Sequence, residues 1–155
     1  MSYVVRGLDP APFRTLFDLS DEELAERGVI RMTVTEKPSF PCRVSLTDRD
    51  VGERVLLLNH VSHDVANPYR ASHAIFVTES VEPAAEYVDE IPPVFAPRIL
   101  SLRGFDKDGM MVEAVIAQPG EADSAIRGLF ANDAVETIHV HNATRGCFAA
   151  KVERN

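Results

Sequence analysis

The stretch that decides the fold is VETIHVHNATRGCFAAKVE, residues 135–153. Apolar and polar residues alternate through residues 135–141 and again through residues 146–153. Because successive side chains of a β-strand point to opposite faces, this alternation is typical of two strands with one buried face each. The short polar stretch between them suits the loop of a hairpin. The sequence therefore predicts an antiparallel hairpin here.

The apolar side chains of this hairpin are Ile138, Val140, Phe148, Ala150 and Val152. The simplest register that places them all on one face pairs His141 with Cys147 and His139 with Ala149. Directly opposed β-carbons of an antiparallel pair lie about 4.5 to 5.5 Å apart. The His141 imidazole and the Cys147 thiol are therefore expected to be neighbours on the polar face.

The remainder of the chain shows mostly the period of strands, interrupted by short helical patterns. Further strands are expected over residues 3–8, 29–36, 54–60, 72–78, 98–105 and 110–118. Helices are expected near residues 13–17, after a capping box at residues 20–23, and over residues 121–131. A turn at residues 106–109 makes a second hairpin. We expect an α+β fold with a mostly antiparallel β-sheet and two or three short segregated helices.

Length and composition restrict the class of protein. With 155 residues, of which 45% are hydrophobic, a single domain over residues 1–155 is expected. A formal net charge of -8 at pH 7 argues against a nucleic-acid partner, because phosphate binding needs a broad basic face. No apolar run approaches the ~18 residues that a membrane span needs, so no membrane partner is expected. Two widely separated cysteines and the lack of a signal-peptide pattern predict a cytoplasmic location.

Reactive side chains gather in three windows, residues 37–43, 59–76 and 137–147. The windows make up less than a quarter of the chain, yet they contain all five histidines and both cysteines. They hold one acidic residue, Asp64, where an even spread of the chain's acids would place about five or six. If the fold brings the windows together, an acidic protein carries one neutral-to-positive pocket.

A pocket for a small anionic molecule is the function that this chemistry favours. Guanidinium groups bind carboxylates and phosphates through paired hydrogen bonds, and imidazoles and amides complete the set. The residues expected to bind the anion are Arg43, Arg70, Arg145, His139, Asn142, Tyr69, Lys37 and Ser72. If the pocket also turns its ligand over, Cys147 is the candidate nucleophile, with His141 and His73 as candidate acid-base groups.

Three alternatives to this function stay open. His139, His141 and Cys147 could ligate a zinc-like ion, since alternate strand positions can aim two imidazoles at one point. The polar face could instead meet a protein partner, in a noncatalytic interaction module or subunit. The histidines could also be ordinary residues on a half-solvated face, with Cys147 as small strand filler. The sequence identifies no cofactor and no oligomeric state.

Five stretches of the sequence carry a resemblance to a known family. They are KPSFPCRVSL at residues 37–46, LLNH at 57–60, PYRASHAIF at 68–76, DGMM at 108–111 and HNATRGCF at 141–148. With these motifs the chain resembles a family of short, mostly bacterial proteins known as domain of unknown function 1203. The resemblance spans nearly the full length. It implies no activity, cofactor or catalytic residue, so the site rests on the residues alone.

Overall fold

The computed structural model describes all residues, 1–155, and contains two antiparallel β-sheets. The larger sheet has the strand order β5-β1-β9-β8-β6-β7, and the smaller has the order β2-β3-β4. The larger sheet contains β1 (Tyr3–Arg6), β5 (Glu86–Val88), β6 (Leu100–Phe105), β7 (Met111–Ala117), β8 (Thr137–Asn142) and β9 (Phe148–Arg154). The smaller sheet contains β2 (Ile30–Thr33), β3 (Arg54–His63) and β4 (Ala71–Thr78).

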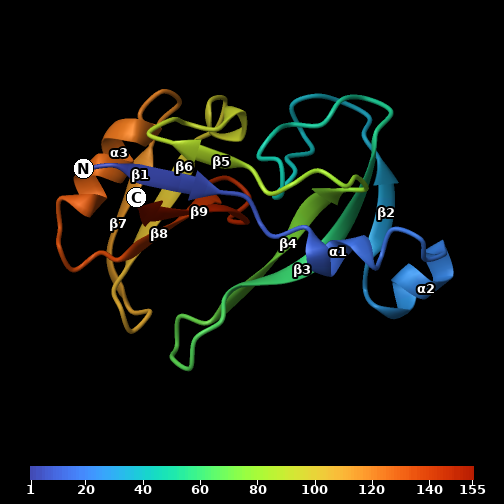
Figure 1. Cartoon of the computed structure of the whole chain (residues 1–155), viewed down its shortest axis with the longest axis horizontal. Helices are drawn as coiled ribbons and strands as arrows, with labels where there is room; N and C mark the ends of the chain where they lie inside the picture. Colours follow the sequence, from blue (N-terminus) through green and yellow to red (C-terminus); the bar gives the residue numbers. More distant parts are fainter.

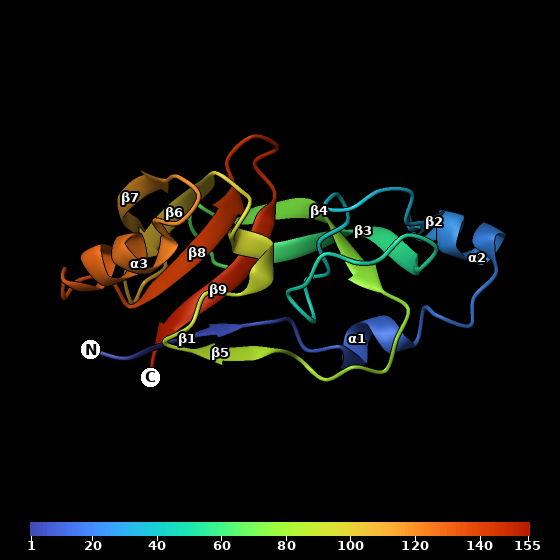
Figure 2. The same cartoon turned by 90° about the horizontal axis from the view of Figure 1, so that it is seen from above.

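Three short α-helices and one 3-10 turn accompany the sheets. They are α1 (Ala11–Arg14), α2 (Asp21–Glu26), α3 (Ala122–Phe130) and the turn η1 (Pro93–Phe95). Figures 1 and 2 show α3 beside the larger sheet, whereas α1 and α2 lie near the smaller one. The predicted α+β fold, with a mostly antiparallel sheet and segregated helices, is confirmed. No helix is long and apolar enough to cross a membrane.

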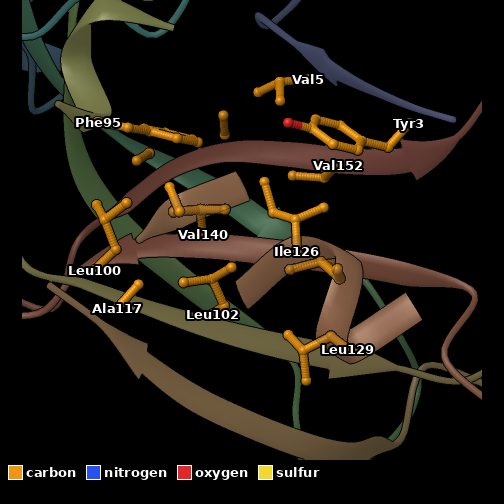
Figure 3. Close-up of a cluster of buried hydrophobic side chains, with 14 of the residues drawn as sticks. Tyr3, Val5, Phe95, Leu100, Leu102, Ala117, Ile126, Leu129, Val140 and Val152 are labelled. Atoms are coloured by element: carbon orange, nitrogen blue, oxygen red, sulfur yellow. The ribbon is translucent and has the colours of Figure 1, made fainter. Parts of the chain in front are cut away.

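Each sheet has its own cluster of buried apolar side chains. The larger cluster holds 18 residues and joins the six-stranded sheet to α3 and η1; Ile126, Leu129 and Val140 meet in it (Figure 3). A second cluster of nine residues lies between the smaller sheet and the first two helices, with Leu24 and Leu56 fully buried. The single domain expected over residues 1–155 stays a prediction.

The β8–β9 hairpin forms, but its register differs from the predicted one. The observed pairs include Ile138 with Val152, His139 with Lys151, Val140 with Ala150 and His141 with Phe148. The register shifts between the last two of these pairs, so that Ala149 is an extra residue in a β-bulge. Ala149 and Ala150 therefore both pack in the larger apolar cluster.

The bulge moves Phe148 off the apolar face to which the alternation assigned it. Its ring lies instead against the imidazoles of β8, with centroids 5.5 Å from His139 and 5.8 Å from His141. Cys147 is then outside the strand, at the end of the hairpin loop. The predicted pairs of His141 with Cys147 and of His139 with Ala149 are wrong, because a regular alternation does not allow for one inserted residue.

Local signals in the sequence give the positions of α2 and of the β6–β7 turn, whereas α1 covers Ala11–Arg14 and ends earlier than the expected residues 13–17. The Ser20 side chain accepts from the Glu23 amide and the Glu23 carboxylate accepts from the Ser20 amide, which is the predicted capping box. The predicted turn at residues 106–109 joins β6 to β7. The strand β5 was not predicted, because it is short and lies within a connection rich in proline.

Gly7 occupies the point where the chain leaving β1 crosses the backbone at Val44. A β-carbon on Gly7 would lie 1.9 Å from the Val44 carbonyl oxygen, so even alanine forces the two segments apart. We expect Gly7→Ala to lower the free energy of unfolding by about 3 kcal/mol. Gly128 in α3 has nothing within 4 Å of such a β-carbon, and Gly128→Ala should stabilise the helix by about 0.5 to 1 kcal/mol.

Urea denaturation of the two alanine variants at pH 7 measures both effects. Equal and small changes in the two variants would show that the crossing at Gly7 adjusts without strain.

Candidate functional site

The polar face of β8 is covered by the long β3–β4 hairpin, and this cover brings the histidines together. The ring centroids of His63 and His139 are 4.9 Å apart, and those of His73 and His141 are 4.8 Å apart, both in edge-to-face geometry. His60 pairs with His73 across the hairpin, and its ring centroid is 6.0 Å from that of Phe148. Segments far apart in the sequence thus meet at one interface between the sheets.

Two contacts hold the tip of the β3–β4 hairpin on the larger sheet. The Nε2 atom of His63 is 2.9 Å from the carbonyl oxygen of Gly109, and Asn67 donates to the carbonyl of Asp108 at 3.1 Å. Both acceptors belong to the β6–β7 turn, and Figure 1 shows the two hairpin loops side by side. His139 and His141 are only 4% and 2% exposed as a result. The alternative in which they lie on a half-solvated face is wrong, because that face has a cover that local periodicity does not reveal.

The buried imidazoles are held in their neutral form. Burial lowers the pKa of His139 to about 3 and that of His141 to about 4, and the nearby guanidinium of Arg103 adds to both shifts. Burial also lowers the pKa values of His60 and His73. At neutral pH these four rings are therefore uncharged.

His141 has a defined tautomer. Its Nδ1 is 2.9 Å from the carbonyl oxygen of Gly146, and because a carbonyl only accepts, Nδ1 carries the proton. The Nε2 atom of His141 is then the one with a free lone pair.

A cleft of about 480 Å³ opens next to these rings, between β4, the proline-containing loop at residues 38–41 and the β8–β9 loop. Its charged and potentially reactive lining residues are Arg43, His73, Arg98, Asn142, Arg145 and Cys147. None of the residues that line the cleft is acidic. The structure thus brings parts of all three sequence windows to one cleft.

Arg43 is the most unusual of these residues, because it is 2% exposed and has no carboxylate partner. Its Nε donates to the carbonyl of Phe148 at 2.8 Å, and its Nη1 donates to the carbonyl of Pro41 at 2.6 Å. Its Nη2 is 3.2 Å from Sγ of Cys147. Burial lowers the pKa of Arg43, although guanidinium groups stay charged in proteins. The buried positive charge is balanced by dipoles and sulfur rather than by an acid.

The other two arginines of the cleft differ from each other. Arg98 donates to both carboxylate oxygens of Asp48, at 2.6 and 2.8 Å, so its charge is compensated. Arg145 is exposed in the β8–β9 loop and makes no ion pair. Arg98 was not among the predicted site residues, because it lies at the end of a proline-rich connection outside the three windows.

Cys147 is partly exposed, and its sulfur receives two N–H groups. They come from Nη2 of Arg43 at 3.2 Å and from Nδ2 of Asn142 at 3.4 Å. His141 makes its hydrogen bond to Gly146 instead, so the expected contact of this imidazole with the thiol does not form. Cys42, by contrast, is 2% exposed and packs in the smaller apolar cluster, as expected for a free cysteine.

The structure leaves six of the predicted site residues outside the lining of the cleft. One of them is His141, which is 2% exposed and whose ring packs against that of His73. Arg70 pairs with Asp64 at 3.1 Å near the hairpin tip, and Tyr69 packs edge-on against Phe105. Lys37 is exposed and pairs with Asp50 at 2.6 Å. Ser72 lies on the surface of β4, and His139 is buried behind the cleft.

The histidines do not form a ligand set for a metal ion. No group of three or more His, Cys, Asp or Glu side chains is arranged to hold one. The five rings stack edge-to-face or lie apart, so their nitrogens do not converge on one point. The zinc-like alternative therefore receives no support from the geometry.

Comparisons with known proteins identify a family without a known activity. The model of the family described as "Protein of unknown function (DUF1203)" matches residues 39–154. Neither the curated proteins nor the solved structures contain a match to this chain. The match covers most of the chain and includes every residue that lines the cleft except Pro38. The resemblance seen in the motifs is confirmed, and this chain belongs to the DUF1203 family.

Proposed function

We propose that the cleft binds a small anionic metabolite. The observation that carries the proposal is the pair of guanidinium groups, Arg43 and Arg145, that line the cleft without a carboxylate partner. A buried charge without a counter-charge is costly, and an anion in the cleft offsets that cost. The absence of acidic lining residues means that nothing in the cleft competes for these cations.

Arg43 keeps donors free for such a ligand. A guanidinium has five N–H groups, and three atoms of Arg43 are engaged with Phe148, Pro41 and Cys147. These contacts hold the planar group in one orientation, so a carboxylate or phosphate that binds the remaining N–H groups meets a prearranged partner. Arg145, which is exposed in the β8–β9 loop, supplies a second charge to the cleft.

Cys147, His73 and His141 are the groups that a reaction in this cleft would use. Cys147 and His73 line it, and Sγ of Cys147, the candidate nucleophile, faces N–H donors from Arg43 and Asn142. His73 is neutral at pH 7 and packs on His141, whose Nε2 lone pair is free. Binding of the anion is thus the main proposal, and chemical turnover of the bound anion is a second step that depends on it.

The test of binding is Arg145→Ala. Loss of one charge-assisted contact should weaken binding of the anion by about 10- to 100-fold. The melting temperature should change little, because the exposed side chain of Arg145 makes no ion pair. Isothermal titration calorimetry with inorganic phosphate and with small carboxylates measures the first effect, and thermal unfolding measures the second.

Arg70→Ala is the matched control, because it removes the same charge from the hairpin tip, outside the cleft. Equal losses of affinity in the two variants would mean that the effect comes from the change in net charge and not from a contact in the cleft. An Arg145→Ala protein that simply unfolds would indicate a structural role for the loop. Failure of the unmodified protein to bind any phosphate or carboxylate would leave the noncatalytic interaction module as the better explanation.

A further inference from the structure

The strand β7 has one free edge. It is the last strand of the larger sheet and pairs only with β6, and Figure 2 shows it at one end of that sheet with α3 beside it. The backbone of residues 111–117 makes no hydrogen bond outside this ladder, so the N–H and C=O groups on the other side have no partner. Edge strands are commonly protected by lysine, by proline or by being very short, and this seven-residue strand has none of these features. Its edge can therefore pair with an extended chain.

A groove of about 350 Å³ lies between this edge and α3. Its lining residues are Glu113, Val115, Ile116, Glu121, Ser124, Ala125, Gly128 and Leu129, of which half are apolar. A β-carbon on Gly128 would have nothing within 4 Å, so the helix leaves room for the side chain of a partner at this point. The groove shares no residue with the cleft between the sheets.

Two carboxylates lie at opposite ends of the groove. Glu113 accepts from Nδ2 of Asn132, which follows the C-terminal end of α3, at 2.9 Å. Glu121 directly precedes α3 and accepts from the backbone N–H of Gln118 at 2.9 Å. Neither carboxylate forms an ion pair, and no basic residue lines the groove. A partner with cationic side chains is therefore complementary in charge.

The register of a strand added to β7 fixes the spacing of those cations. Val115 and Ala117 pack toward α3, and Glu113 shares their face because side chains alternate along a strand. A residue of the added strand opposite Glu113 thus meets one carboxylate, and the residue two positions along lies opposite Val115. The residue four positions along lies opposite Ala117, next to the end of the strand where the Glu121 carboxylate binds the following amide. The matching pattern is basic-x-apolar-x-basic, which reads the same in either strand direction.

We propose that this groove binds an extended peptide segment with the pattern basic-x-apolar-x-basic, which adds to β7 as a further strand of the larger sheet. Main-chain hydrogen bonds to the free edge give affinity, and the alternate side chains in the groove give selectivity. A second copy of this chain fits less well, because its own β7 would bring another Glu113 and no cation. The proposal is independent of anion binding in the cleft.

The test is a titration of the isotope-labelled protein with the peptide acetyl-TKTLTKT-amide, followed through the backbone amide signals in NMR. Signals of β7 and α3 should shift, and those of the cleft should not. The charge-reversed peptide TETLTET should bind at least about tenfold more weakly. The peptide KKTLTTT, which has the same composition without the spacing, should bind at least about threefold more weakly. Equal binding of the three peptides, or no binding of TKTLTKT, would overturn the proposal.

Variants of the groove separate a specific contact from a general effect of charge. Glu113→Gln and Glu121→Gln should each weaken binding of TKTLTKT by about two- to fivefold, because glutamine keeps an acceptor but loses the charge. Glu90→Gln is the matched control, because it removes the same charge from an exposed residue just after β5, at the opposite edge of the sheet. Equal losses in all three variants would contradict the proposal.

Gly128→Leu tests the groove itself. The leucine side chain should fill the space beside β7 and reduce binding of TKTLTKT by at least about tenfold, with no loss of thermal stability. Undiminished binding in this variant would place the peptide elsewhere and contradict the proposal. Analytical ultracentrifugation checks the competing occupant: a dimer of the unmodified protein that Ala114→Lys, at the exposed centre of β7, dissociates would assign the edge to a second copy instead.

Discussion

Lowering the pH from 7 to 5 should reduce the free energy of unfolding by about 4 kcal/mol through His139 and His141. Burial lowers the pKa of these rings to about 3 and about 4, whereas in the unfolded chain they titrate near 6.5. The unfolded state therefore binds more protons in this range. The stability that the neutral rings provide is complete above pH 6.5, decreases as the pH falls, and is lost when each folded-state pKa is reached.

No acid is available to relieve the charge on these rings. The groups that act on His139 are His63 from β3, His141 on the same strand, Lys151 from β9 and Arg103 from β6, and each of them disfavours the imidazolium. Small domains have only about 5 to 15 kcal/mol of stability, so this loss is a large share of it. Chemical denaturation at pH 7, 6 and 5 measures the change.

His139→Phe isolates the contribution of one ring. The position is lined by Phe105 and Phe148, and none of the hydrogen bonds of the structure involves the His139 ring, so phenylalanine should be accepted at pH 7. The variant should then lose about 2 kcal/mol less than the unmodified protein between pH 7 and 5. Identical pH dependence in both proteins would show that His139 is not buried in the neutral form.

Replacing Arg43 with methionine should abolish anion binding, with a loss of more than about 100-fold in affinity. Two charge-assisted hydrogen bonds to the ligand disappear, and the Phe148 and Pro41 carbonyls lose their donor. The variant should also be less stable by about 2 kcal/mol, because those carbonyls stay buried. Calorimetry and urea denaturation report the two effects separately.

The same substitution tests whether Arg43 activates Cys147. Without the guanidinium 3.2 Å from Sγ, the rate at which iodoacetamide alkylates Cys147 at pH 7 should fall by about tenfold. Arg43→Lys keeps a charge but not the planar fork, so it should recover part of the rate and little of the affinity. Cys42 is an internal control, because its burial should protect it in every folded variant. Slow, ordinary alkylation of Cys147 in the unmodified protein would argue against its role as a nucleophile.

The sequence predicted the strands and helices of this fold better than it predicted which residues face one another on neighbouring strands and sheets. Alternation, the capping box at Ser20 and the turn before Met110 act over a few residues, and the corresponding elements are present. The bulge at Ala149 inserts one residue into β9, and a regular alternation of apolar and polar residues contains no signal for it. This one residue separates the predicted partner of His141 from the observed one.

The clustering of reactive side chains could be predicted, but the members of the cleft could not all be named. Arg43 and Arg145 reach it as expected. Arg70 does not reach the cleft. It lies near the tip of the long β3–β4 hairpin, far from the base of that hairpin, and it pairs there with Asp64. Arg98 enters the cleft wall through the fold of a connection that has no periodicity. Composition can indicate that reactive side chains gather in a few windows, whereas the residues that line the cleft depend on tertiary structure.

The place of β1 in the larger sheet has a consequence for how the family is delimited. The matched residues begin at position 39, yet β1 lies between β5 and β9, and Tyr3 and Val5 are fully buried. A polypeptide limited to the matched residues would lack an interior strand and expose two unpaired sheet edges. The boundary of sequence similarity is therefore not the boundary of an autonomous folding unit.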